Sequence, residues 1–225
     1  ALRSDGTLYV SYCLSSAPAA CKVSRIDAQG NFIAAFDVST NGSVFPLALS
    51  ADEQFLLVAG GMTTIGGVTI PSRANLAKLD SVTGAMDLNW IPFPTGNGNA
   101  RGILTDGSAH VIVAGAIPGG TEGFARVPLA NPGTADLGFG PDFGPSTNVT
   151  GSELMRAPDG DLVVAGAFTL ADGQSRPAGI ARLSPDGNTV RPGWGVNAPI
   201  GGASTHTATM SPTGKVALPR FTRPG

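Results

Sequence analysis

The stretch VVAGAFTLADGQSRPAGIARLSPDG at residues 163–187 contains an apolar segment of strand length, a glycine-rich connection, a second strand and an Asp-Gly turn. Two of its fragments recur along the chain. The tripeptide Val-Ala-Gly at 164–166 is also found at 58–60 and 113–115, and a basic residue of the second strand recurs at similar spacing. Both series indicate a repeat of about fifty residues, a period typical of propellers and arrays. The basic series consists of Arg25, Lys78, Arg126 and Arg182.

An aromatic residue follows each member of the basic series by 11 to 13 positions. Fragments of strand length bounded by turn residues lie between these markers, and each unit is predicted to contain about four strands. The predicted units span 1–44, 45–98, 99–147 and 148–200, with a partial unit at 201–225. The aromatic series consists of Phe36, Trp90, Phe139 and Trp194.

The composition favours a folded all-β chain. Glycine and proline contribute 32 and 18 of the 225 residues, yet 42% of the residues are hydrophobic and can form a core. Glu and Lys are scarce, and no long stretch lacks both Gly and Pro, so helices are not expected.

The repeat predicts a β-propeller of four-stranded antiparallel blades within a single domain. Blades of this kind bury both faces against their neighbours, which explains strands that are nearly continuously apolar. About four and a half blades are visible. Since both ends of the chain match inner strands and unprotected edges promote aggregation, we expect the chain to form part of a larger ring.

The sequence resembles the bacterial delta-sixty-type repeat, whose blades carry a G-x-F-T…G…ARL…DG signature. This resemblance implies a β-propeller from a mostly uncharacterised family that is often surface-exposed or secreted and has no shared catalytic centre. A second copy of the signature is carried by Gly60, Met62, Thr63, Gly67, Ala77, Lys78 and Leu79. The best copy is carried by Gly166, Phe168, Thr169, Gly173, Ala181, Arg182, Leu183, Asp186 and Gly187.

The two cysteines of the chain, Cys13 and Cys21, flank the connection between the second and third strands of the first unit. Paired across a hairpin, they are expected to form a disulfide. A disulfide places the protein in the periplasm, at the cell surface or in the medium. The alternative is a pair of reduced thiols in a cytosolic protein.

The basic and aromatic series each allow two interpretations. A ring of equivalent cations could bind acidic sugars or carboxylates. A periodic residue more often serves the repeat, here by pairing with a carboxylate or carbonyl of a neighbouring turn and so tying one blade to the next. The aromatic rings could stack on sugars, yet burial between blades is their usual role. Both series are therefore predicted to be structural.

The sequence gives little support for nucleic-acid binding, a membrane span or a metal site. A net charge of −2 with dispersed Lys and Arg argues against nucleic acid, and no apolar run is long enough to span a membrane. The two histidines, His110 and His206, lack metal-site spacing, and the Asp-Gly pairs are explained by tight turns. Neither a metal nor another cofactor is expected.

Two functions remain open at this point. The favoured one is a non-catalytic extracytoplasmic binding or scaffold module, in an adhesin-like surface protein or as an accessory subunit of an envelope complex. Its partner would be another protein or the remaining blades of the same polypeptide. The alternative is a carbohydrate-binding or carbohydrate-active propeller, with a site in the central funnel near Asp106, Glu153 and His206.

Overall fold

In the computed structural model the described residues are 1–14, 21–70, 74–95, 98–118, 123–141, 143, 153–166, 168, 170–176, 179–194 and 208–217. Every regular element in these ranges is a β-strand, so the all-β class is confirmed. Over the same residues, no helix has the length and apolar character that a membrane span requires. The strands are β1 (Leu8–Cys13), β2 (Cys21–Ile26), β3 (Phe32–Thr40), β4 (Val44–Leu49), β5 (Phe55–Gly60), β6 (Thr64–Ile65), β7 (Val68–Thr69), β8 (Leu76–Asp80), β9 (Asn99–Asp106), β10 (His110–Ala116), β11 (Phe124–Pro128), β12 (Glu153–Arg156), β13 (Leu162–Ala165), β14 (Leu170–Ala171), β15 (Gln174–Ser175), β16 (Ile180–Leu183), β17 (Thr209–Met210) and β18 (Val216–Ala217).

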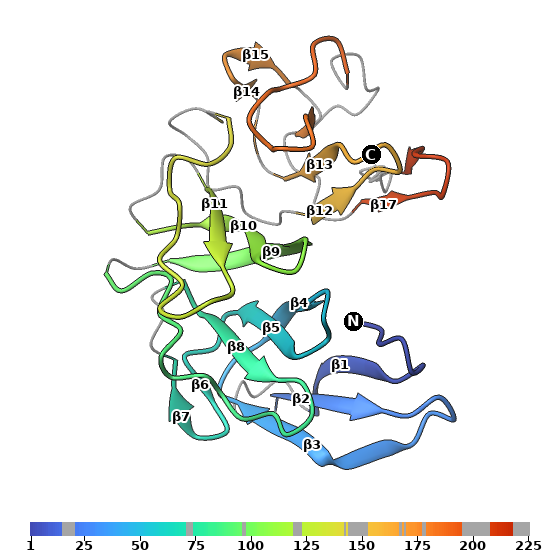
Figure 1. Ribbon diagram of the computed structural model, residues 1–225, viewed down its shortest axis with the longest axis vertical. Coiled ribbons are helices and arrows are strands. Elements are labelled where there is room, and N and C mark those ends of the chain that lie inside the picture. Colours follow the sequence, from blue (N-terminus) through green and yellow to red (C-terminus); the bar gives the residue numbers. More distant parts are fainter. Residues whose placement is uncertain are drawn as a thin grey trace, which may run out of the picture.

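The strands form small antiparallel sheets that succeed one another along the chain. The first has the order β1-β2-β3-β6-β7, and the next three have the orders β4-β5-β8, β9-β10-β11 and β12-β13-β16. Two further hairpins pair β14 with β15 and β17 with β18. Figure 1 shows the sheets following one another along an arc that is open on the side of β1 and β17.

In the second, third and fourth sheets the predicted fourth strand is reduced to a single bridge. After β8, β11 and β16, the described chain returns to the sheet only through isolated bridges, at Met86, Asp136 and Val190. In the second and third sheets an Asp ends the pairing, because its carboxylate accepts the backbone N–H two residues later, as Asp136 does from Gly138. The chain then turns away from the sheet edge. The first sheet differs, since β3 continues for nine residues.

The middle strands are buried on both faces, as propeller packing requires. Along β10, Val111 and Val113 belong to one hydrophobic cluster and Ile112 and Ala114 to the next. Strands β5 and β13 alternate between two clusters in the same way. Since side chains in a strand point alternately to opposite faces, each middle strand joins the sheets on its two sides into one continuous core.

Candidate functional site

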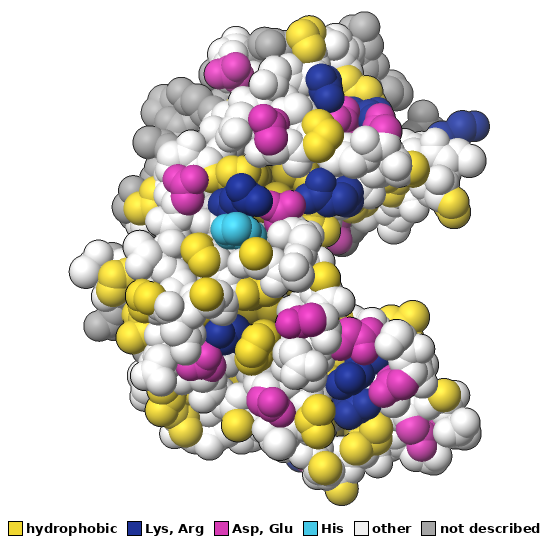
Figure 2. Space-filling model, in the orientation of Figure 1, with side chains coloured by type: hydrophobic (Ala, Val, Ile, Leu, Met, Phe, Trp, Pro, Cys, Tyr) yellow, Lys and Arg dark blue, Asp and Glu magenta, His cyan; other side chains and the backbone are white. Residues whose placement is uncertain are grey.

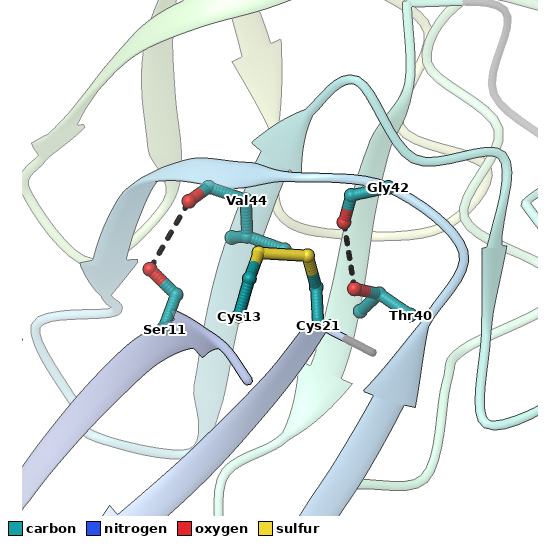
Figure 3. Close-up of a disulfide and its surroundings, with 6 residues drawn as sticks. All are labelled: Ser11, Cys13, Cys21, Thr40, Gly42 and Val44. Carbon is teal, nitrogen blue, oxygen red and sulfur yellow. Dashed lines mark hydrogen bonds between the residues drawn. A yellow bond between two sulfur atoms is a disulfide. The ribbon is translucent and has the colours of Figure 1, made fainter. Parts of the chain in front are cut away.

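The predicted disulfide is present between Cys13 and Cys21, which form the last pair of the β1–β2 ladder. Their Cα atoms are 3.9 Å apart. Figure 3 shows the bond beside the start of β4, where the Ser11 hydroxyl donates to the Val44 carbonyl at 3.1 Å. The Cys21 side of the bond is buried and the Cys13 side is exposed. The bond therefore closes one end of the first sheet next to its neighbour.

Replacing both cysteines by serine is expected to lower the free energy of unfolding by about 2–3 kcal/mol, because a short closed loop restricts the unfolded chain. Urea denaturation of the oxidised chain and of the Cys13→Ser/Cys21→Ser variant measures the difference. A reductant should destabilise only the native sequence. Equal stability of the two proteins would show that the bond contributes nothing.

The basic series occupies equivalent positions on β2, β8, β11 and β16, opposite β1, β5, β10 and β13. Three of its four members pair with an Asp-Gly turn of their own sheet, whose glycine has a positive φ. Each ion pair joins the strand that carries the arginine to a turn of the same sheet, next to the strand that it pairs with, rather than joining one blade to the next. The pairs are Arg25 with Asp5, Arg126 with Asp106 and Arg182 with Asp159.

Lys78 is the exception. In the matching turn of its sheet, Asp52 accepts hydrogen bonds from Ser50 and Gln54, and Glu53, at the glycine position, accepts hydrogen bonds from Ser4 of the first sheet. The buried Lys78 ammonium lies 3.0 Å from Asp87 and donates to the Leu129 carbonyl at 2.7 Å. Only here does the series link two sheets. Burial would raise the pKa of Asp87, but hydrogen bonds, first among them the one from Lys78, bring it below its usual range.

Asp161 is the most heavily engaged carboxylate near this series. It is 5% exposed, accepts two hydrogen bonds from Arg191 at 2.8 and 3.0 Å, and accepts one from Arg182 at 2.9 Å. Hydrogen bonds from Arg191 hold the pKa of the Asp161 carboxyl below its usual range against the opposing effect of burial, and Arg182 adds to the lowering. The Asp161 carboxylate therefore binds a proton more weakly in the folded chain than in the unfolded chain.

The Asp161 carboxylate should consequently make the free energy of unfolding fall as the pH is lowered into the acid range. With a folded pKa below the ordinary value of about 3.9, the carboxylate stabilises the fold above that value, and the contribution is lost as pH falls through the folded pKa. We expect Asp161→Asn to be less stable at neutral pH and to lose less stability between about pH 5 and pH 2. Denaturation of both proteins across this range measures the slope. An unchanged slope would contradict the prediction.

The aromatic series lies between successive sheets. Phe36, Trp90 and Phe139 are buried and Trp194 is half-buried, each within a different one of the four clusters that join neighbouring sheets. Three of the rings are thus covered by the next sheet and are not available to stack on a ligand. Their assignment as packing residues is consistent with this placement.

A cavity of about 740 Å³ lies where the inner strands meet on the concave side of the arc. It is lined by β4, β9 and β12, together with part of β1. Figure 2 shows the molecule hollowed at this open side. Among the lining residues, Phe45, Arg101 and Glu153 carry a large exposed ring or a charge. The volume lies in the range of small-molecule sites.

Two β-bulges direct side chains toward this cavity. On β4, Val44 pairs with Gly60 and Leu47 with Val58, so Phe45 and Pro46 together oppose a single residue. On β9, Ala100 pairs with Gly115 and Gly102 with Ala114, so Arg101 is the extra residue. Bulges often redirect a side chain near functional sites.

The glycines opposite the bulges end two of the repeated Val-Ala-Gly tripeptides. Gly60 has φ 155° and Gly115 has φ 144°, values that favour glycine. A Cβ atom would lie 2.2 Å from the Ser43 carbonyl oxygen at Gly60 and 2.4 Å from that of Asn99 at Gly115. The tripeptide is therefore more than a marker of the repeat, because its glycine allows the inner strand to bulge.

The two charged side chains that line the cavity, Arg101 and Glu153, form no ion pair or hydrogen bond with the described part of the chain. The Arg101 guanidinium lies 6.0 Å from the centre of the Phe45 ring and makes no ion pair or hydrogen bond with a described residue. Glu153 likewise has no side-chain partner there, and burial raises its pKa. By contrast, Arg3, Arg25, Arg126, Arg156, Arg182 and Arg191 all pair with carboxylates.

The funnel residues suggested by the sequence are only partly brought together. Glu153 lines the cavity, but Asp106 does not, because it is held by Arg126 and Arg156 at 2.8 Å each. His206 lies outside the described residues. Phe45 and Arg101 were missed, since neither belongs to a repeated series. The described ranges hold no group of three His, Cys, Asp or Glu side chains able to bind a metal ion, and the expectation of a metal-free protein stays a prediction.

Successive antiparallel sheets with an aromatic residue between them are the features of a β-propeller repeat. In agreement, residues 157–189 match the family model "Domain of unknown function (DUF5122) beta-propeller". No curated protein matches the chain. The chain is similar to a chain in the crystal structure of the mitotic checkpoint complex, with 14% identity and a TM-score of 0.52 over 95% of this chain and 55% of that one. This likeness shows the fold alone.

A second solved structure is a "putative 6-phosphogluconolactonase" from Bacteroides fragilis. It has 16% identity and a TM-score of 0.48, and the match covers 94% of this chain and 60% of that one. The chain thus spans less than two thirds of the length of either structure.

Proposed function

We propose that this chain is a non-catalytic extracytoplasmic β-propeller module that binds a ligand or partner through its concave face. It would act within an adhesin-like surface protein or as an accessory subunit of an envelope complex, and it would belong to a ring of delta-sixty-type blades. Its partner is a protein, further blades of the same polypeptide or a glycan. The observation that carries the proposal is the cavity, in which the side chains of Arg101 and Glu153 form no ion pair or hydrogen bond with the described chain.

The composition of the cavity favours binding over catalysis. Glycoside hydrolysis usually requires two carboxyl groups on either side of the scissile bond, and Glu153 is the only acid among the described lining residues. The aspartates near the basic series are held by arginines in turns of the sheets. The Cys13–Cys21 bond supports the extracytoplasmic location, because disulfides persist in oxidising compartments.

The proposal is tested by measuring binding and turnover on the same panel of polysaccharides and envelope proteins, using the full polypeptide with its native flanks. Binding without product release is expected. Product release that is abolished by Glu153→Gln would overturn the non-catalytic assignment. Thiol labelling in cells checks the location, since Cys13 and Cys21 should react only after reduction.

A further inference from the structure

We propose that the bulges of β4 and β9 form a subsite for the carboxylate of an acidic saccharide, with Arg101 binding the carboxylate and Phe45 stacking on the sugar ring. This inference rests on the proposed binding function and specifies its ligand. It assigns roles to two residues that lie outside both repeated series, and it uses the one cavity wall where a charge and an exposed ring lie together.

Arg101 differs from most other arginines of the described chain in having no carboxylate partner there. Six other arginines of the described chain are paired with carboxylates, whereas the Arg101 guanidinium faces the cavity without such a partner among the described residues. A guanidinium presents a planar fork of donors that matches a carboxylate in two parallel hydrogen bonds. An anion from outside would therefore supply the partner that the fold supplies to these six arginines.

The Phe45 ring lies beside the Arg101 guanidinium. Phe45 is 61% exposed although it directly follows the buried Val44 in β4, because the bulge turns its side chain out of the core. An exposed aromatic face next to a cation fits a ligand that carries an apolar C–H face and an anionic group together. A uronic acid has both, and its hydroxyl groups can donate to Glu153 on the third inner strand.

The inner strands at the cavity are poorly suited to an extended peptide. A peptide that adds a strand needs a regular edge of free N–H and C=O groups. Here both inner strands are interrupted by bulges at the cavity, and Pro46 has no N–H to offer. Side chains rather than backbone must make the contacts, which favours a compact ligand. A cavity of about 740 Å³ accepts a disaccharide.

The test compares digalacturonate with its methyl ester, which keeps the rings and removes the charge. Calorimetry with the full polypeptide should show binding of the acid at least about tenfold tighter than binding of the ester, and weaker binding of the acid in high salt. Arg101→Gln should abolish the preference for the acid. Phe45→Leu should weaken binding of both ligands by a similar factor, about fivefold.

Matched variants separate the site from general effects. Arg156→Gln removes an arginine that is paired outside the cavity, and Phe32→Leu removes a ring that is 63% exposed elsewhere, so both should bind like the native protein. Thermal melts confirm that each variant is folded. Equal affinity for acid and ester, or an unchanged preference in Arg101→Gln, would overturn the subsite while leaving a binding module in place.

Two other outcomes are distinguishable. No binding of either saccharide, with capture of an acidic peptide that depends on Arg101, would overturn the saccharide ligand and keep the concave face as a binding site. Hydrolysis of digalacturonate would instead overturn the non-catalytic function on which the inference rests.

Discussion

Trp90→Ala is expected to lower the free energy of unfolding by about 3–5 kcal/mol, the usual cost of removing a large buried aromatic side chain. Trp90 is 1% exposed and lies in the cluster that joins the β4-β5-β8 sheet to the β9-β10-β11 sheet. Its Nε1 donates to the Pro128 carbonyl at 2.8 Å, and its ring lies 5.6 Å from the Lys78 ammonium. The substitution would leave a cavity between two sheets and an unpaired carbonyl. Chemical denaturation measures the loss.

A nearby residue provides the control. Leu88 precedes Trp90 by two positions and is 53% exposed, so Leu88→Ala should change stability by less than about 0.5 kcal/mol. Trp194→Ala, at a half-buried ring, should fall between the two. If Trp90→Ala costs no more than Leu88→Ala, the ring does not hold the sheets together.

The parts of the fold that repeat could be predicted from the sequence. Each middle strand is packed on both faces, so its residues are apolar in every copy, and the basic and aromatic positions recur because each sheet needs the same ion pair and the same filling residue. The length of the repeat and the all-β class could be predicted from these recurring positions. The disulfide could be predicted for a different reason, since two cysteines were placed opposite each other by the strand assignment itself.

The candidate site could not be predicted in this way, because it depends on residues that differ between copies. Phe45 and Arg101 occupy bulges on two inner strands but share no chemistry, so no periodic pattern marks them. The available signal was the glycine ending each Val-Ala-Gly tripeptide, whose backbone permits the bulge. Lys78 shows the same limit. Its partners differ from those of the arginines although the matching turn of its sheet keeps an aspartate, Asp52, and a glutamate, Glu53, replaces only the glycine.

Gly187→Ala is expected to lower the free energy of unfolding by about 2–5 kcal/mol. Gly187 ends the stretch at 163–187 that contains the best copy of the repeat, and its φ is 78°. A Cβ atom there would lie 2.3 Å from Cζ of Phe139, the aromatic ring of the preceding sheet. The substitution therefore combines a strained backbone with overpacking. Gly133 meets Trp90 in the same way, since a Cβ atom at Gly133 would lie 2.3 Å from the indole Nε1.

The overpacking can be separated from the backbone strain by Gly193→Ala. Gly193 has φ 75°, but no atom lies within 4 Å of its Cβ position, so this variant should show only the backbone cost of about 1–2 kcal/mol. Phe139→Leu should remove much of the contact, and the double variant Phe139→Leu/Gly187→Ala should be more stable than the sum of the single losses predicts. Strict additivity, or equal losses in Gly187→Ala and Gly193→Ala, would show that the glycine does not accommodate the ring. The coupling would be direct evidence that the turn at Asp186 and Gly187 accommodates Phe139, the aromatic residue of the preceding blade.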